Sequence, residues 1–160
     1  MSWLVNTTGY KLMLLLHILA VIVAFAPGFV WPFVSVSLKK AQKPVGPAIG
    51  ELAAGNTVKV HGPALIIAGL LGFGLIGMSK PEGFEEAIFS FSDAWISASM
   101  LVWFIIIGLV FGLMLPAEKK AAAGDEGAEK IISAVGGALH LLLAVMLYLM
   151  IFKPGFDLAG

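Results

Sequence analysis

Two histidines, His17 and His140, lie within two of the four long apolar runs of this chain, in which 59% of the residues are hydrophobic. An ionisable side chain is costly at membrane depth, and such residues usually face the interior of a helix bundle. A buried imidazole can bind a metal or haem iron, or it can form a hydrogen bond. These two side chains are therefore the first candidates for chemistry.

The apolar runs that carry the histidines are long enough to cross a membrane. A helix rises about 1.5 Å per residue, so about 20 residues span a hydrocarbon core of about 30 Å. The runs are apolar all round, whereas a soluble bundle alternates polar and apolar faces. We predict an all-α membrane protein with four transmembrane helices in an up-down bundle, forming one domain over 1–160. The predicted spans cover about 11–37, 61–79, 93–115 and 130–152.

The lysines predict the orientation of this bundle. All ten basic residues are lysines, and seven of them follow the first or third span. Because positively charged loops stay in the cytoplasm, we expect loops 38–60 and 116–130 to be cytoplasmic and both termini to lie outside the cell membrane. The seven lysines are Lys39, Lys40, Lys43, Lys59, Lys119, Lys120 and Lys130.

The rest of the composition excludes several classes of function. The chain has no cysteine, which excludes disulfides and thiolate metal sites. It has a net charge of zero and no arginine, the residue best suited to grip phosphate groups, so nucleic acid is not expected as a partner.

The connecting segments carry weaker signals. The segment 43–62 is rich in glycine and proline, which predicts a connector with at most one helical turn. His61, at the start of the second span, is expected to be solvated. Between the second and third spans, apolar residues at helical spacing beside glutamates predict a short interfacial helix over 82–91.

Each histidine lies on a stripe of small residues along its helix. The stripe either lets neighbouring backbones approach closely or leaves a slot for a flat cofactor. Both histidines are therefore expected to point inward. The small residues are Ala20, Ala24 and Gly28 in the first helix and Ser133, Gly136, Gly137 and Ala144 in the fourth.

Depth along the helices separates the two histidines. Counted from the lysines at the outer boundary, His17 lies about 9 Å deep and His140 about 20 Å deep. Axial ligands of one haem lie at nearly the same level, so this offset disfavours a haem held by both. Tyr148 and Ser97 lie at about the depth of His17 and are its expected hydrogen-bond partners.

His140 has no comparable side-chain partner near its depth. Pro27 removes the backbone donor that would otherwise satisfy the carbonyl of Val23, at nearly the same level. We predict that a ring nitrogen of His140 lies near that carbonyl.

A metal hypothesis rests on Met13, one helical turn before His17. Thioether and imidazole ligands together suit Cu(I). Methionine in an apolar span more often fills the core.

The first helix also resembles a known family. The run Leu14-Leu15-Leu16-His17-Ile18-Leu19-Ala20, with Pro27-Gly28 and Lys39-Lys40 after it, resembles the opening of an uncharacterised bacterial family of predicted integral membrane proteins. That family is distantly similar to the membrane domain of copper-resistance D proteins. The resemblance implies a four-helix membrane protein in which His17, and with it His140, matches a family position. It implies no activity, because none is established for the family.

Three hypotheses of function follow. The first is a non-enzymatic membrane protein, an accessory subunit or homo-oligomer, whose histidines are buried hydrogen-bonding groups and whose Gly108 and Gly112 form the contact if they face lipid. The second is a b-type haem or quinone-linked electron carrier, with His17 and His140 as ligands or polar contacts. The third is a permease for copper or another small solute, with Met13 and His17 near the outer mouth.

Overall fold

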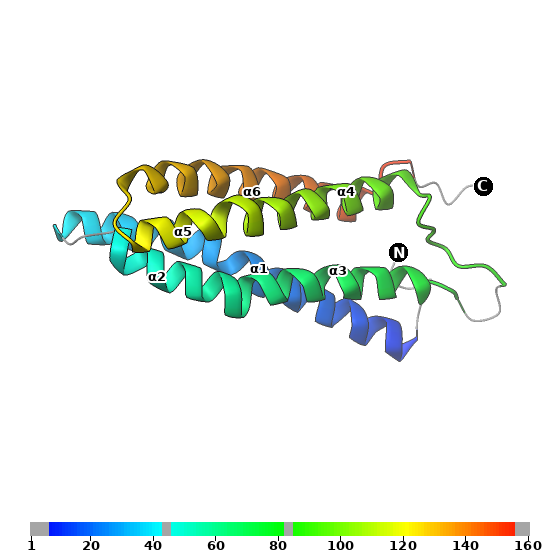
Figure 1. The fold of residues 1–160 in the computed structure, drawn as a ribbon. Coiled ribbons are helices and arrows are strands. Elements are labelled where there is room, and N and C mark those ends of the chain that lie inside the picture. Colours follow the sequence, from blue (N-terminus) through cyan, green and yellow to red (C-terminus); the bar gives the residue numbers. More distant parts are fainter. Residues whose placement is uncertain (1–6, 43–45, 82–84, 156–160) are drawn as a thin grey trace.

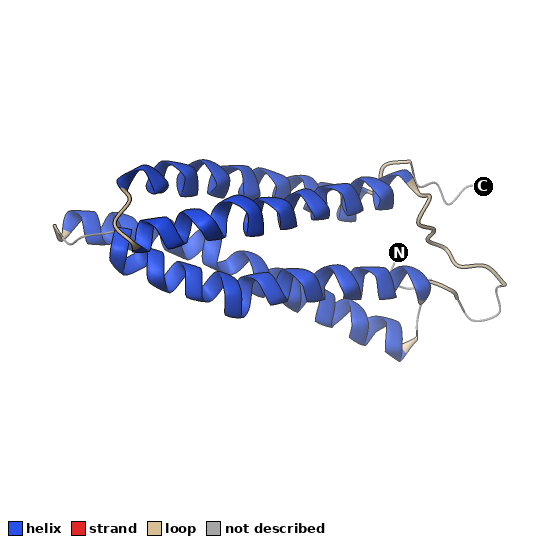
Figure 2. Ribbon diagram, in the orientation of Figure 1, coloured by secondary structure: helices blue, strands red, loops and turns tan. Residues whose placement is uncertain are grey.

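The computed structural model describes residues 7–42, 46–81 and 85–155, and all the regular structure in these ranges is helical (Figure 2). Six α-helices and two short π-helical turns, η1 and η2, follow one another. In chain order they are α1 (Thr8–Lys40), α2 (Gly46–Asn56), η1 (Thr57–His61), α3 (Gly62–Gly77), α4 (Ala94–Leu109), η2 (Val110–Met114), α5 (Leu115–Ala122) and α6 (Glu126–Phe152).

These elements form four long rods that pack as an up-down bundle (Figure 1). Each rod is long and apolar enough to cross a membrane: Thr8–Lys40, Ile49–Gly77, Ala94–Ala122 and Glu126–Phe152. The predicted fold class is therefore confirmed. We call the end of the bundle at which α1 begins and α6 ends the terminal end. The opposite end, where a short turn connects α5 to α6, is the loop end (Figure 1).

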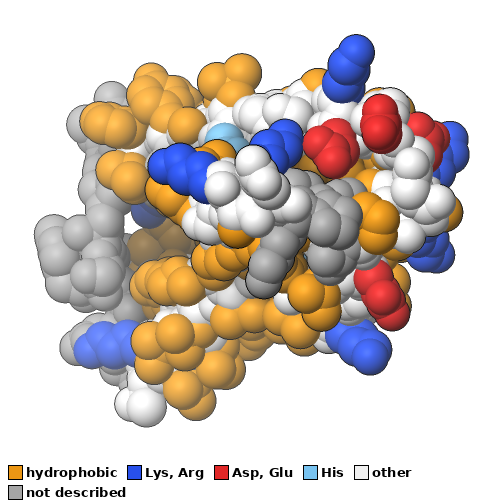
Figure 3. Space-filling model, turned by 90° about the vertical axis from the view of Figure 1, so that its left-hand side faces the viewer, with side chains coloured by type: hydrophobic (Ala, Val, Ile, Leu, Met, Phe, Trp, Pro, Cys, Tyr) orange, Lys and Arg blue, Asp and Glu red, His pale blue; other side chains and the backbone are white. Residues whose placement is uncertain are grey.

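The outer surface of the bundle is apolar, as contact with lipid requires. Phe33 is 76% exposed and Ile151 is 69% exposed, and many other large apolar side chains also face outward. Charged side chains gather at the loop end. Figure 3 looks onto this end and shows lysines spread around it, acidic side chains mainly on one side, and hydrophobic side chains between them.

Both π-helical turns come just before a proline. Proline has no N–H, and its ring clashes with the carbonyl four residues earlier. In each case the residue ahead of the proline reaches back five residues instead of four. The Gly62 N–H donates to the carbonyl of Thr57, and the Leu115 N–H donates to that of Val110. One extra residue in the turn thus keeps each rod continuous through its proline.

The four rods pair unevenly along their length. α1 packs mainly on α3, α4 packs on α6, and α2 packs on α5, whereas α3 and α4 touch little. At the loop end the backbones nearly meet, because a Cβ on Gly50 would lie 2.4 Å from the amide nitrogen of Ala122. Figure 1 shows α3 and α4 separating toward the terminal end. The bundle is therefore closed at the loop end and divided into two helix pairs at the other.

The connectors differ from the sequence-based expectations. Residues 46–61 are helical, not a connector with at most one turn. Pro47 lies in the first turn of α2, where its missing N–H has no helical partner to lose. Packing of Gly50 against α5 offsets the low helix propensity of glycine. The link 116–130 shrinks to residues 123–125, because α5 extends to Ala122 and α6 begins at Glu126.

The interfacial helix predicted over 82–91 is absent from the part that the structure describes. Residues 82–84 lie outside the described residues, and 85–91 form bends and a turn. Hydrogen bonds to Ser79 hold this segment in place of helical ones. The Ser79 hydroxyl accepts the Phe89 N–H at 3.0 Å, and the Ser79 carbonyl accepts the Ile88 N–H at 3.1 Å.

Candidate functional site

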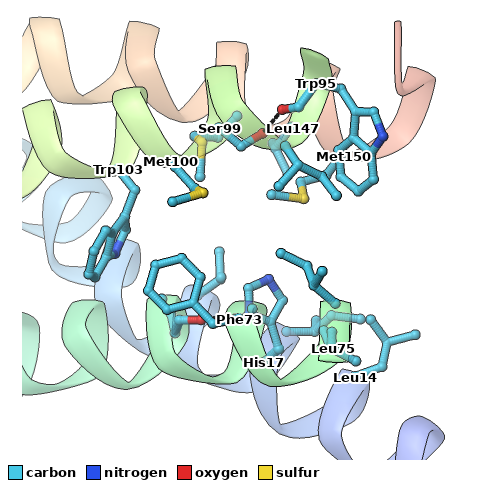
Figure 4. A pocket seen from close by; sticks show the side chains of 18 of the residues that line it. Leu14, His17, Phe73, Leu75, Trp95, Ser99, Met100, Trp103, Leu147 and Met150 are labelled. Atoms are coloured by element: carbon cyan, nitrogen blue, oxygen red, sulfur yellow. Dashed lines mark hydrogen bonds between the residues drawn. The ribbon is translucent and has the colours of Figure 1, made fainter. Parts of the chain in front are cut away.

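A cavity of about 600 Å³ lies between the two helix pairs, toward the terminal end. Its walls come from α1, α3, α4 and α6, and most of the lining side chains are aliphatic or aromatic (Figure 4). The cavity is partly open, because α3 and α4 touch little beside it. We call it the large cavity.

His17 is the histidine of this cavity. Its Nδ1 lies 2.8 Å from the carbonyl oxygen of Ala68 on α3. A carbonyl only accepts, so Nδ1 donates and the neutral ring keeps the lone pair on Nε2. The ring can approach α3 because Gly72 has no side chain; a Cβ there would lie 3.4 Å from the His17 Cε1. The α1–α3 contact thus fixes both the orientation of the ring and the nitrogen that remains available.

The free edge of the imidazole faces the opposite helix pair. In Figure 4 the ring of His17 extends from the α1/α3 side into the space below Met100, Leu147 and Met150 of the α4/α6 side. Met146 also lines this space. An accepting nitrogen on one wall and polarizable thioethers on the other are therefore the chemical groups that a ligand would meet.

Trp103 holds the inner end of the large cavity. Its Nε1 donates to the carbonyl of Leu65 at 3.0 Å, and its ring packs edge to face on Phe73 with centroids 5.6 Å apart. The indole lies directly over Gly69, where a Cβ would come within 2.3 Å of the ring. This contact joins α4 to α3 across the inner end of the cavity.

The end of the large cavity nearest the terminal end of the bundle is more polar. Lys153, which caps α6, lies with its Nζ 4.7 Å from the ring centre of Phe89 and 5.5 Å from that of Trp95. Partial burial among these rings lowers the pKa of the Lys153 amine. Tyr10 and Trp95 line the same end. The large cavity therefore runs from a cationic, aromatic mouth to an apolar interior.

His140 lines a different cavity. This small cavity, of about 50 Å³, lies between α1, η1, α5 and α6. The Nδ1 of His140 donates to the carbonyl of Gly136 on its own helix at 2.7 Å. Its ring packs against α1, edge to face on Phe29 with centroids 4.7 Å apart and beside Gly28. The two histidines thus line separate cavities, in agreement with their offset in depth.

The expected partner of His140 was wrong, although α1 does lie beside it. The Nδ1 of His140 donates to the carbonyl of Gly136, one turn earlier in α6, and not to that of Val23. α1 continues as a helix through Pro27, which lines the small cavity together with Gly28. The bond within α6 needs no neighbouring helix, because donor and acceptor lie four residues apart in the same helix.

The expected partners of His17 are also different. Ser97 donates to the carbonyl of Phe91 at 2.9 Å, and Tyr148 is 53% exposed and stacks on Phe152. A backbone carbonyl of α3 takes their place because small residues on α3 let the imidazole reach the backbone.

Met13 contributes to packing near His17. Its sulfur lies against Gly74, and it belongs to a small apolar cluster with Tyr10 and Leu75. In the described part of the chain Met13 does not line the large cavity, and no group of three His, Cys, Asp or Glu side chains converges as a metal site would require.

Three residues of the small cavity were missed or misplaced by sequence reasoning. Glu118 is only 4% exposed and Thr57 is 1% exposed, although both were assigned to loops. His61 is 8% exposed, so the expectation that it is solvated was wrong. One signal was available: Glu118 follows Pro116 at the end of an apolar run without a polar break, which indicates a helix that continues.

Gly108 and Gly112 both face outward. They are exposed, and a Cβ on either would meet nothing within 4 Å. This is the orientation that the hypothesis of a subunit contact required.

No family model, curated protein or solved structure matches the chain. The resemblance of the first helix to a family therefore stays a prediction.

Proposed function

We propose that this four-helix protein binds a flat lipophilic molecule bearing a hydroxyl group, of the hydroquinone class, in the large cavity. The observation that carries the proposal is the fixed imidazole of His17. Because Nδ1 donates to Ala68, Nε2 is the acceptor that faces the cavity. It therefore suits the O–H of a hydroquinone better than the carbonyl of a quinone.

The shape and lining of the cavity support the same ligand class. A volume of about 600 Å³ is typical of small-molecule sites, which are mostly apolar with a few polar groups that fix orientation. Phe73 and Trp103 offer aromatic faces for an aromatic ring, and the partly open side gives an isoprenoid tail a path toward lipid. The role proposed is binding and delivery within the membrane, not turnover.

A b-type haem is the second candidate, and the methionines favour it. Nε2 of His17 would bind the haem iron, and Met100, Met146 or Met150 from the other helix pair would supply a thioether. The haem would supply one-electron redox chemistry. This candidate needs only His17, whereas the sequence-based hypothesis also used His140.

The orientation of the bundle belongs to the proposal as well. The lysines at the loop end favour a cytoplasmic loop end and an outward-facing large cavity in the cell membrane. The chain has no cysteine, so Lys120→Cys introduces a single thiol at the loop end. An impermeant thiol reagent should label this thiol from the cytoplasmic side only.

The test of the ligand uses purified protein in detergent. We expect a short-chain hydroquinone to quench tryptophan fluorescence saturably and His17→Ala to weaken binding about 3- to 10-fold, the effect of losing one hydrogen bond. His140→Ala is the matched control and should bind as the wild type does. Equal binding by all three proteins would overturn the proposal.

The absorption spectrum of the same preparation separates the candidates. A Soret band that is lost in His17→Ala and kept in His140→Ala would replace the hydroquinone by haem. A colourless preparation, with a quinone recovered in the organic extract of wild type but not of His17→Ala, supports the hydroquinone.

A further inference from the structure

The small cavity at the loop end is an unassigned polar site. Its volume of about 50 Å³ is enough for at least one water molecule. Pro27 and Phe25 of α1, Met114 before α5 and Leu139 of α6 make its walls mainly apolar. Polar side chains from three separate elements line this apolar shell: Thr57 and His61 from η1, Glu118 from α5, and His140 from α6.

Glu118 is the central group of the small cavity. Its side chain is 96% buried, since its relative exposure is 4%, and the Thr57 side chain lines the same cavity. Among the described residues, its Oε2 has no hydrogen-bond partner. A carboxylate that is buried without a counter-charge is strongly unfavourable, so the group requires a proton or a cation.

His61 supplies the second unsatisfied atom. Its exposure is 8%, and no described residue provides a hydrogen-bond partner for its Nε2. The π-helical turn holds it on the same inner side as Thr57, four residues earlier, because the Gly62 N–H bonds to Thr57 across five residues. Two unpartnered polar atoms, Glu118 Oε2 and His61 Nε2, thus belong to side chains that line one cavity.

The surrounding charges do not neutralise Glu118. On its own helix, Lys119 and Lys120 are exposed, as is Glu51 on the facing α2. On α6, Glu129 pairs with Lys39 of α1 at 3.4 Å on the surface. The other titratable lining residue is His140, whose Nδ1 is already bonded to Gly136. Among the described residues, therefore, a proton is the compensating charge that this site favours, since a hard cation would want several oxygen ligands.

We propose that Glu118 and His61 form a proton-binding site at the loop end, in which Glu118 holds the proton and a water in the small cavity bridges it to Nε2 of His61. In the step, a hydronium ion gives its proton to a carboxylate oxygen of Glu118 and leaves as water. The O–H that forms donates to the bridging water, which in turn donates to the lone pair of Nε2. The site is independent of ligand binding in the large cavity.

The test is modification with dicyclohexylcarbodiimide, a lipophilic reagent that adds only to protonated carboxyl groups. The carboxyl O–H adds across one N=C bond of the reagent, and the acyl group then migrates to nitrogen to leave a stable adduct. We expect the Glu118 peptide of the folded protein to be modified at neutral pH, and more so as the pH falls. Exposed Glu51, and Glu129, which is paired with Lys39, serve as internal controls and should remain unmodified.

Two further measurements keep the proposal falsifiable. Infrared spectra should show a protonated-carboxyl C=O band that is lost in Glu118→Gln and shifted in His61→Gln. If neither the reagent nor the infrared band detects a protonated carboxyl at residue 118, the proposal is overturned. Protection from the reagent by Na⁺ at constant pH would replace the proton by a cation, and a band unchanged in His61→Gln would remove the bridge. Should Glu118→Gln not fold, the pH dependence of wild-type labelling at Glu118 decides.

Discussion

The two cavities occupy opposite ends of the same bundle and differ in what separates the helices. At the terminal end, the indole of Trp103 lies over Gly69 and holds two helix pairs around about 600 Å³ of mainly apolar space. At the loop end, Gly50 lets α2 and α5 touch through their backbones, and only about 50 Å³ remains nearby. A large side chain thus lies between the helices beside the ligand-sized cavity, whereas a glycine lets the helices meet near the small polar one.

The histidines differ in the same way. His17 donates a hydrogen bond to Ala68, which lies on another helix and 51 residues away in the chain. The direction in which its second ring nitrogen points therefore depends on the tertiary structure. His140 bonds to the carbonyl four residues earlier in α6, a contact that its own helix provides. The large cavity therefore depends on how α1 meets α3, while the small cavity depends on how α2 and η1 meet α5.

The largest expected effect concerns the backbone contact at the loop end. Gly50→Ala should lower the free energy of unfolding by about 3 kcal/mol, because its Cβ would meet the Ala122 nitrogen at 2.4 Å and backbone cannot move aside as a side chain can. Thermal unfolding in detergent measures this.

The matched control is Gly55→Ala in the same helix, where a Cβ meets nothing within 4 Å. This variant should keep or slightly raise stability, since alanine favours helix by about 1 kcal/mol over glycine. Equal stability of the two variants would mean that α2 and α5 are not in backbone contact.

A smaller effect is expected at the terminal end. Gly69→Ala should cost about 1 to 2 kcal/mol and displace Trp103, because the indole, unlike backbone, can rotate away at the cost of its bond to Leu65. Unfolding experiments and the binding assay together measure the change. Gly77→Ala, in open space on the same helix, is the control.

The double variant Gly69→Ala/Trp103→Leu sharpens this prediction. If steric conflict with the indole causes the loss, the double variant loses less stability than the sum of the two single variants. Additive losses would show that conflict with Trp103 does not cause the loss.

The smallest effect is expected for Ser99, which lines the large cavity. Ser99→Ala should change stability by less than about 0.5 kcal/mol, because the hydroxyl donates to the Trp95 carbonyl, which the helix already satisfies. Ser97→Ala should cost more, about 1 kcal/mol, because its hydroxyl is bonded to a loop carbonyl, that of Phe91. A loss of ligand binding in Ser99→Ala without a loss of stability would instead make this hydroxyl a ligand contact.

Much of the fold could be predicted because it follows from local composition. Runs of about 20 apolar residues have to form helices in a membrane, since no other partner satisfies their backbone. This rule was enough to predict the four spans and their up-down arrangement. The choice of His17 and His140 as candidates also followed from the cost of placing an ionisable group in such a run.

Local composition failed where packing reverses a propensity. The segment 46–61 contains glycines and a proline that disfavour helix, yet contact between Gly50 and α5 stabilises it as one. A glycine costs only about 1 kcal/mol relative to alanine, and Pro47 lies in the first turn, where it removes no helical hydrogen bond. Near this contact, Glu118 and His61 are buried, although both were expected at the surface.

The sequence by itself determined that this chain is a four-span helical protein with an imidazole in its first and last spans, because helix formation and membrane burial depend on neighbours along the chain. Only the tertiary structure decided that these imidazoles line separate cavities, that His17 offers Nε2, and that Glu118 is buried beside His61. Those features arise from contacts between residues about 50 or more positions apart, and no local pattern encodes which helix backbone an approaching side chain will meet.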